Sequence, residues 1–171
     1  MSGAAEQGSQ VGGYLIRAAA EPDLDAIAGF EVDIALASFG AEAITDPGLH
    51  RKRVLAALGK SGEVALVAVA AQRPADPLGW AWLSARTNSL TGARYGNFRS
   101  LAVADVPDRS LIGELLLGEV LRATAEAGLT QLTGKVHAGN LGMRALYRKF
   151  GFEATHVTME RRMPGSGGVL P

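Results

Sequence analysis

Hydrophobic and polar positions follow two different periods along the chain, and the period changes several times. Residues 14–19, YLIRAA, form a short apolar run. Residues 21–39 then carry apolar side chains at helical spacing, after Pro22 and an acidic first turn. A second helical stretch spans 45–58, with cap-forming residues at its start and Gly59 after its end. This pattern predicts a strand followed by two helices.

The middle of the chain has the pattern of three strands. Residues 62–72, GEVALVAVAAQ, are apolar on both faces, which is typical of a strand that is covered on both sides. After a turn, residues 78–86 place Trp80 and Trp82 on one face. Residues 96–105 form the third run. Because the connections are short, we expect an antiparallel meander.

The last third of the chain returns to helical spacing twice. From Asp108 an apolar stripe runs through positions 112, 115, 116, 120, 123 and 127 and ends at Gly128. We expect residues 130–136 to be a strand, a helix from about Asn140, and residues 152–162 to be a closing strand. The order is β-α-α-β-β-β-α-β-α-β. The strand, helix, strand unit at 97–136 predicts a right-handed parallel crossover within a mixed α/β sheet.

Length and composition narrow the function classes. A chain of 171 residues suits one domain, expected at 14–162 between flexible tails at 1–13 and 163–171. Lys plus Arg and Asp plus Glu both number 17, so no net charge favours a nucleic acid or a membrane as partner. The chain lacks cysteine, which excludes disulfides and thiol nucleophiles. Without a signal peptide or an apolar run of about 20 residues, we expect a cytoplasmic protein.

Residues 137–152, HAGNLGMRALYRKFGF, carry the most informative spacing. Asn140 and Tyr147 lie seven residues apart, close to two helical turns, so they share a helix face with Met143 between them. Leu146 and Phe150 lie on a different, apolar face. Asn140 is also a favourable N-cap residue. The stretch predicts an amphipathic helix that is closed by a glycine and borders either solvent or a reaction centre.

The order of elements and the spacing N-x-x-x-x-x-L-Y-x-x-x-G-F, here starting at Asn140, resemble the GNAT superfamily of acyl-CoA-dependent N-acetyltransferases. The resemblance covers about residues 14–162. It implies a GNAT fold, with a mixed, mostly antiparallel sheet, a central parallel strand pair that splays apart, and flanking helices. It also implies acetyl-CoA as co-substrate and an amine as acceptor.

The resemblance implies that the Tyr147 hydroxyl points at the sulfur of coenzyme A, where the leaving thiolate must be stabilised or protonated. With reference pKa values of about 10 for tyrosine and about 8.5 for a thiol, complete proton transfer is uphill by roughly 2 kcal/mol, so we favour a hydrogen bond. Backbone groups around Leu101 and Val103 are expected to pair with the pantetheine amides and to hold the thioester carbonyl. Asn140 caps its helix, and contact with the cofactor is its alternative role.

The helix that starts near Asp108 is expected to bind the cofactor pyrophosphate through its N-terminal amides. GNAT proteins carry Q/R-x-x-G-x-G/A at this turn. Aligned on Gly113, this chain has Asp108 at the Gln/Arg position and Leu111 at the first glycine. A carboxylate at position 108 would repel the pyrophosphate unless it is turned away, and the alternative is an ordinary capped core helix. The expected binding residues are Arg109, Ser110, Leu111, Ile112, Gly113 and Glu114.

A general base is harder to assign. An alkyl ammonium has a pKa of about 10, so a side chain or a water chain should remove its proton. Several GNAT enzymes use a glutamate at the position that Arg99 occupies here. His137, at the end of the next strand, is the candidate base, and a loop residue is its alternative role. Glu31 and Asp33 are weaker candidates, either as base or for recognition of a cationic acceptor.

The expected function is acetyl transfer to a small-molecule or protein amine by direct attack, with Tyr147 and His137 as catalytic residues. The three histidines lack metal-ligand spacing, so we expect no metal. A homodimer is left open. The alternative is a GNAT-fold module that binds an acyl-CoA or a protein without catalysis, which the altered pyrophosphate turn and the missing glutamate would suit. A longer acyl group or a hydroxyl acceptor is a third interpretation.

Overall fold

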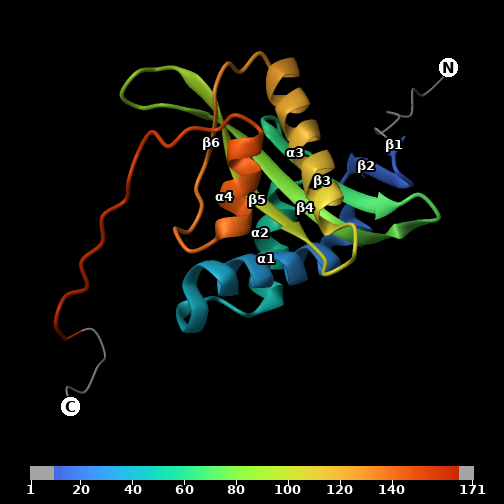
Figure 1. Ribbon diagram of the computed structural model, residues 1–171, viewed down its shortest axis with the longest axis horizontal. Coiled ribbons are helices and arrows are strands. Elements are labelled where there is room, and N and C mark those ends of the chain that lie inside the picture. The colour runs from blue at the N-terminus through green and yellow to red at the C-terminus, as the bar shows by residue number, and fades with distance from the viewer. Residues whose placement is uncertain (1–9, 166–171) are drawn as a thin grey trace.

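A six-stranded sheet forms the centre of the computed structural model, which describes residues 10–165 (Figure 1). Its strands lie in chain order: β1 (Gln10–Val11), β2 (Tyr14–Ala18), β3 (Glu63–Ala70), β4 (Arg73–Thr87), β5 (Arg94–Val103) and β6 (Leu132–Gly134). Neighbouring strands are antiparallel except for β5 and β6, which are parallel. The predicted meander and the predicted parallel pair are both confirmed.

Helices cover the two faces of the sheet. They are η1 (Glu21–Asp23), α1 (Leu24–Phe39), η2 (Gly40–Glu42), α2 (Pro47–Ala57), α3 (Arg109–Glu126) and α4 (Leu141–Lys149). Residues of α3 and α4 pack with Leu83 and Phe98 in one core cluster. Residues of α1 and α2 pack with Trp80 and Trp82 in the other. Since alternate residues of a strand face the same side, the two tryptophans share a face as predicted.

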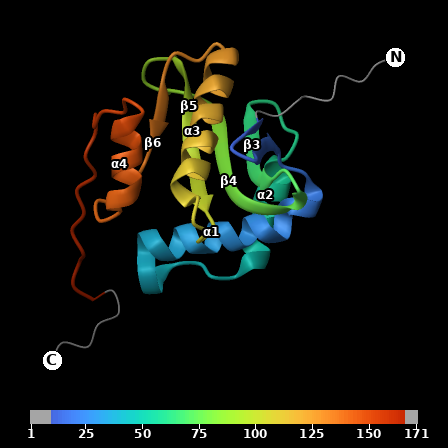
Figure 2. The same cartoon turned by 45° about the vertical axis from the view of Figure 1, so that its right-hand side comes forward.

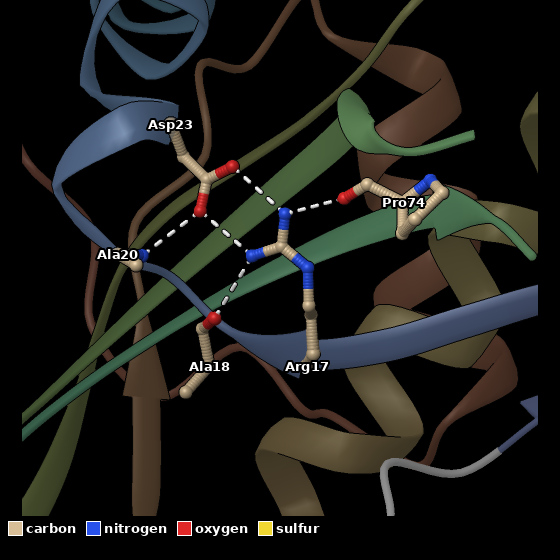
Figure 3. A network of polar contacts seen from close by, with 5 residues as sticks. All are labelled: Arg17, Ala18, Ala20, Asp23 and Pro74. Carbon is tan, nitrogen blue, oxygen red and sulfur yellow. Dashed lines mark hydrogen bonds and ion pairs between the residues drawn. The ribbon is translucent and has the colours of Figure 1, made fainter.

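An ion pair fixes the start of α1 (Figure 3). Arg17 of β2 donates to both carboxylate oxygens of Asp23, at 2.7 and 2.8 Å, and to the carbonyl of Pro74 at 2.7 Å. The Ala20 amide also donates to Asp23, at 2.8 Å. Burial alone would raise the pKa of Asp23, but the hydrogen bonds from Arg17 and Ala20 outweigh it and hold that pKa below its usual range. The network ties η1, and therefore the beginning of α1, to β2 and β4.

The closing strand predicted for 152–162 is wrong. Residues 153–165 are exposed and without strand structure, and both views show them leading away from the sheet on the far side of α4 (Figures 1 and 2). Val157 and Met159 are 80% and 87% exposed, so the apolar side chains of this segment reach no core. A strand needs a partner as well as the right residues, and β6, with three residues, offers only a short edge.

The N-terminal boundary also differs from the prediction. Gln10 and Val11 pair with β2, so four residues assigned to a tail at 1–13 form a hairpin. The turn needs glycine, since Gly12 and Gly13 have φ of 60° and 83°. The rest of the predicted tails, 1–9 and 166–171, lies outside the described residues. Between residues 10 and 165, no helix combines the length and the apolarity that a membrane span requires.

Candidate active site

Strands β5 and β6 pair over three residues and then separate. Their register runs from Gly96 opposite Leu132 to Phe98 opposite Gly134. Beyond Phe98, the edge of β5 that faces β6 has no strand partner among residues 10–165. The strands therefore open into the splay that the GNAT resemblance implies.

A β-bulge marks the same point of β5. Leu83 of β4 pairs with Phe98, while its neighbour Trp82 pairs with Ser100, so Arg99 is the additional residue. This bulge reverses the edge to which each following backbone group points. The sequence pattern does not reveal this bulge. With the extra residue included, the run still has the ordinary length and apolar character of a strand.

The splay exposes backbone groups of β5. The amide of Ala104 donates to the carbonyl of Leu78 in β4, at 2.7 Å. Since alternate residues of a strand direct their amides to opposite edges, the amides of Leu101 and Val103 face away from β4 and toward the opening. Their orientation suits the predicted contact with pantetheine.

Tyr147 reaches from α4 into this opening. Its ring packs edge-on against Phe98, with ring centres 6.1 Å apart, and lies tilted against Phe152, with ring centres 4.6 Å apart. A β carbon built at Gly134 would lie 2.9 Å from Tyr147 Cζ and closer still to the hydroxyl oxygen. Glycine at this position therefore makes room for the hydroxyl where β5 and β6 part. The hydroxyl has no hydrogen-bond partner among residues 10–165.

Burial raises the pKa of Tyr147 to about 12. The hydroxyl is therefore protonated at neutral pH and can donate a hydrogen bond. Relative to a thiol with a pKa of about 8.5, complete proton transfer to the thiolate would be uphill by about 5 kcal/mol. This gap is larger than the one obtained from reference values, so the geometry suits hydrogen-bond donation rather than protonation.

The start of α4 has the predicted cap. The side-chain oxygen of Asn140 accepts a hydrogen bond from the Met143 amide, at 3.0 Å. Asn140, Met143 and Tyr147 line the same cavity, which confirms their shared helix face. Leu146 and Phe150 pack against the core instead.

The carboxylate of Asp108 is turned away from the first turn of α3. It accepts a hydrogen bond from the Tyr14 hydroxyl, at 2.6 Å, and makes no side-chain cap. The Arg109 amide donates to Val106 at 3.0 Å, whereas the amides of Ser110 and Leu111 have no acceptor in the described part of the chain. These two amides are the ones that could bind a phosphate oxygen.

A cavity of about 320 Å³ joins these features. It is lined by α1, by residues 98–105 of β5 and the turn after it, by Arg109, by residues 135–137 after β6, and by α4. Figure 2 shows α1 crossing the end of β5, with α4 beside β6. This volume is in the range of small-ligand pockets.

The cavity gathers some of the predicted site residues and leaves others outside. Leu101, Val103, Arg109, His137, Asn140 and Tyr147 line it. Ser110, Leu111, Ile112, Gly113 and Glu114 do not. Ile112 and Gly113 are buried in the core, and the carboxylate of Glu114 pairs with Lys149. Of the predicted pyrophosphate run, Arg109 lines the cavity, and phosphate binding by the run stays a prediction.

The ring of His137 is exposed and contacts its own loop. Its Nδ1 accepts a hydrogen bond from the Gly139 amide, at 3.0 Å. A neutral imidazole that accepts at Nδ1 carries its proton on Nε2, so Nε2 is a donor in this arrangement. His137 can accept a proton from an amine only after the bond to Gly139 breaks. Its role as a base stays a prediction.

The two acidic candidates on α1 have different surroundings. Glu31 is buried and accepts hydrogen bonds from Trp80 Nε1, at 2.9 Å, and from Arg53. Both of its oxygens are engaged, so Glu31 joins α1 to the sheet and to α2. Asp33 is exposed and lines the cavity, which leaves it free to meet a ligand.

Arg99 lines the cavity too, although the sequence indicated only that the usual glutamate is missing there. Its guanidinium carbon lies 3.6 Å from the centre of a Trp82 ring. Trp82 Nε1 in turn donates to Glu63, at 2.8 Å. Only the predicted position of Trp82 could have indicated from the sequence that Arg99 has an aromatic partner.

The fold matches several solved structures over most of the chain. No family model and no curated protein matches the sequence. A probable acetyltransferase has a TM-score of 0.69 at 21% identity, covering 90% of this chain and 99% of its own. A ribosomal-protein-alanine N-acetyltransferase from Brucella melitensis biovar Abortus 2308 scores 0.64 at 16% identity, covering 88% and 99%. A protein named as a transcriptional regulator, from Bacillus halodurans C-125, scores 0.71 at 15% identity, also covering 88% and 99%.

These identities are too low to carry an activity from one protein to another, but the structural match spans nearly every described element. The expected GNAT architecture is therefore confirmed at the level of the fold. The chain has the fold of the GNAT acetyltransferases.

Proposed function

We propose that the chain transfers an acetyl group from acetyl-CoA to an amine by direct attack. The observation that carries this proposal is the Tyr147 hydroxyl, which is protonated, has no partner in residues 10–165, and stands where β5 and β6 part. Such a donor can stabilise the negative charge that develops on a leaving sulfur atom.

The thioester would supply an electrophilic carbonyl carbon to the amine nitrogen. A C–N bond forms, the C–S bond breaks with its electron pair remaining on sulfur, and the amine loses one proton. Tyr147 donates a hydrogen bond to that sulfur. The outward amides of Leu101 and Val103 bind the extended pantetheine arm, and one of them holds the carbonyl oxygen.

The phosphate end of the co-substrate would lie at the first turn of α3. The unpaired amides of Ser110 and Leu111, the helix dipole and the Arg109 guanidinium favour an anion there. The Asp108 carboxylate repels this anion least in its observed orientation, in which it is bonded to Tyr14. His137, after release from Gly139, or water takes the amine proton.

A module that binds acyl-CoA without catalysis is the second candidate, because Nδ1 of His137, the histidine that lines the cavity, already accepts a hydrogen bond from the Gly139 amide. Two measurements separate the candidates. Calorimetry with acetyl-CoA should show binding, and thiol release should then follow when amines are added. Absence of acetyl-CoA binding would refute both candidates, and binding without thiol release for any amine would favour the module.

A further inference from the structure

Arg99 is a cation in the cavity wall that lacks a carboxylate partner among residues 10–165. Its one hydrogen bond runs from Nη1 to the Ser84 hydroxyl, at 3.4 Å, which is long for such a bond. One face of the guanidinium is covered by Trp82. Since a guanidinium has five N–H donors, most of the donors of Arg99 are unused.

The two carboxylates whose charges act on Arg99, Glu63 and Glu31, are already engaged. Glu63 pairs with Arg86, at 3.3 Å, and Glu31 pairs with Arg53. Burial is the largest effect on the pKa of Arg99 and lowers it; the negative charge of Glu63 opposes this, the positive charges of Arg53 and Arg86 lower the pKa further, and Glu31 raises it least. An arginine nevertheless stays charged near neutral pH. A partly desolvated cation of this kind gains from an anionic ligand.

The charges on the cavity wall favour an anion as well. Three cationic residues line it, Arg99, Arg109 and Lys135, against two acidic ones, Asp33 and Asp105. Arg109 lies at the start of α3, where the phosphates of the co-substrate are proposed to bind. Along β5, the four residue steps from position 99 to position 103 span about 13 Å, so Arg99 lies well away from that end.

Arg99 is close to the proposed reaction centre instead. It follows Phe98 directly, and Phe98 is paired with Gly134, against which the Tyr147 hydroxyl rests. The bulge places the Arg99 side chain next to Trp82, on the sheet face that α1 and α2 cover. An amine that approaches the thioester from this side would have Arg99 beside it.

We propose that Arg99 binds a carboxylate of the acceptor, so that the substrates are amines that also carry a carboxylate, such as amino acids or short peptides. This inference rests on the proposed acetyl transfer. With one face on Trp82, the guanidinium presents its edge, and that edge matches the two oxygens of a carboxylate. Glutamate, which several GNAT enzymes have at this position, would repel such a substrate. Carboxylate binding therefore gives a physical reason for an arginine here.

Matched acceptors test the substrate class. Amino acids are compared with their carboxamides and with the corresponding amines that lack the carboxyl group, and thiol release gives kcat/KM for each. We expect the carboxylate to raise kcat/KM by about 10- to 100-fold. Arg99→Gln should remove this preference while thiol release with the carboxamides persists, and Arg99→Lys should restore part of it.

Arg86→Gln is the matched control. It removes a positive charge from the same cluster, but Arg86 does not line the cavity. The carboxylate preference should therefore survive in this variant. If Arg86→Gln and Arg99→Gln reduce the preference equally, the effect comes from overall charge, and direct binding by Arg99 is refuted. Preference for an amine that carries a phosphate over its carboxylate counterpart would also overturn the proposal.

A binding measurement separates this inference from the proposed function. The chain has two tryptophans, Trp80 and Trp82, and the second contacts Arg99, so intrinsic fluorescence reports on the site. N-acetyl amino acids should change the fluorescence of the wild type at concentrations at least about 10-fold below their carboxamides, and Arg99→Gln should abolish the difference. An Arg99-dependent response without thiol release for any amine would refute acetyl transfer but keep the carboxylate site. Equal responses to acid and amide would refute the carboxylate site alone.

Discussion

The hydroxyl group of Tyr147 occupies the space beside Gly134 that a side chain at position 134 would fill. Gly134 is the last residue of β6 that pairs with β5, so the tyrosine on α4 reaches the place where the two strands separate. The small size of Gly134 and the position of the Tyr147 hydroxyl therefore depend on each other. The position of the hydroxyl depends on the absence of a β carbon.

Gly134→Ala should displace Tyr147 without unfolding the protein. The φ angle of Gly134 is not positive, so alanine can adopt the backbone, but its β carbon overlaps the tyrosine ring and hydroxyl. Because small misplacements of a reacting group are costly, we expect turnover to fall by roughly 10- to 100-fold. Circular dichroism should show an unchanged fold, and thiol release gives the rate.

Gly118→Ala, in the middle of α3, is the control for that substitution. Apart from its chain neighbours and the backbone of its own helix, no atom of the described residues lies within 4 Å of its built β carbon. Removing a glycine from a helix should leave turnover unchanged and raise the free energy of unfolding by up to about 1 kcal/mol. Full activity of Gly134→Ala would show that catalysis does not need the hydroxyl at this place.

Tyr147→Phe isolates the hydroxyl from the ring. The contacts of the ring with Phe98 and Phe152 remain, while the hydrogen bond to the developing thiolate is lost. We expect kcat to fall by roughly 10²-fold, with the dissociation constant of acetyl-CoA nearly unchanged. Single-turnover rates and calorimetry measure the two quantities. A variant with wild-type kcat would remove Tyr147 from the mechanism.

The raised pKa of Tyr147 predicts how stability depends on alkaline pH. The folded protein holds the neutral hydroxyl, with a pKa of about 12. The unfolded chain ionises near pH 10, so this contribution is complete below pH 10 and is lost as pH rises toward 12. The loss amounts to about 3 kcal/mol. Denaturant unfolding compared with Tyr147→Phe checks it, and a phenol that titrates near pH 10 in the folded protein would contradict it.

The sequence predicted the order of elements well because periodicity is a local property. The cap at Asn140 and the face shared by Asn140 and Tyr147 follow from helix geometry alone, and both are observed. Features that depend on which strands pair with each other could not be predicted from the sequence. The bulge at Arg99 depends on how β4 pairs with β5, and the missing strand after Phe152 depends on the short edge of β6.

Asp108→Asn should strengthen the binding of acetyl-CoA. The carboxylate stands at the start of α3, where its charge opposes a phosphate, while asparagine can still accept the bond from Tyr14. We expect the dissociation constant to fall about threefold at low ionic strength and the difference to shrink as salt is added. Asp76→Asn removes an equal charge at an exposed position of β4 and should have no effect. A weaker or unchanged affinity in Asp108→Asn would place the phosphates elsewhere.

Asp23→Asn should destabilise the fold through the start of α1. The Asp23 side chain is 3% exposed and pairs with Arg17, whose side chain is 26% exposed, so removal of the charge leaves a partly desolvated guanidinium without its carboxylate partner. We expect a loss of about 2 kcal/mol at pH 7, below the figure for a fully buried pair because solvent reaches Arg17. Denaturant unfolding gives the value.

The pH dependence of that loss identifies its cause. Because the pKa of Asp23 is below its usual range in the folded state, the stabilisation is present above the unfolded pKa of about 4 and disappears as pH falls through the folded value. The difference between wild type and Asp23→Asn should therefore shrink in strong acid. Asp25→Asn, two residues away, breaks an ion pair with Arg51 in which the Asp25 side chain is 88% exposed, and should cost less than about 0.5 kcal/mol at any pH. Equal losses in the two variants would mean that general charge, and not the bridge from β2 to η1, stabilises this end of the molecule.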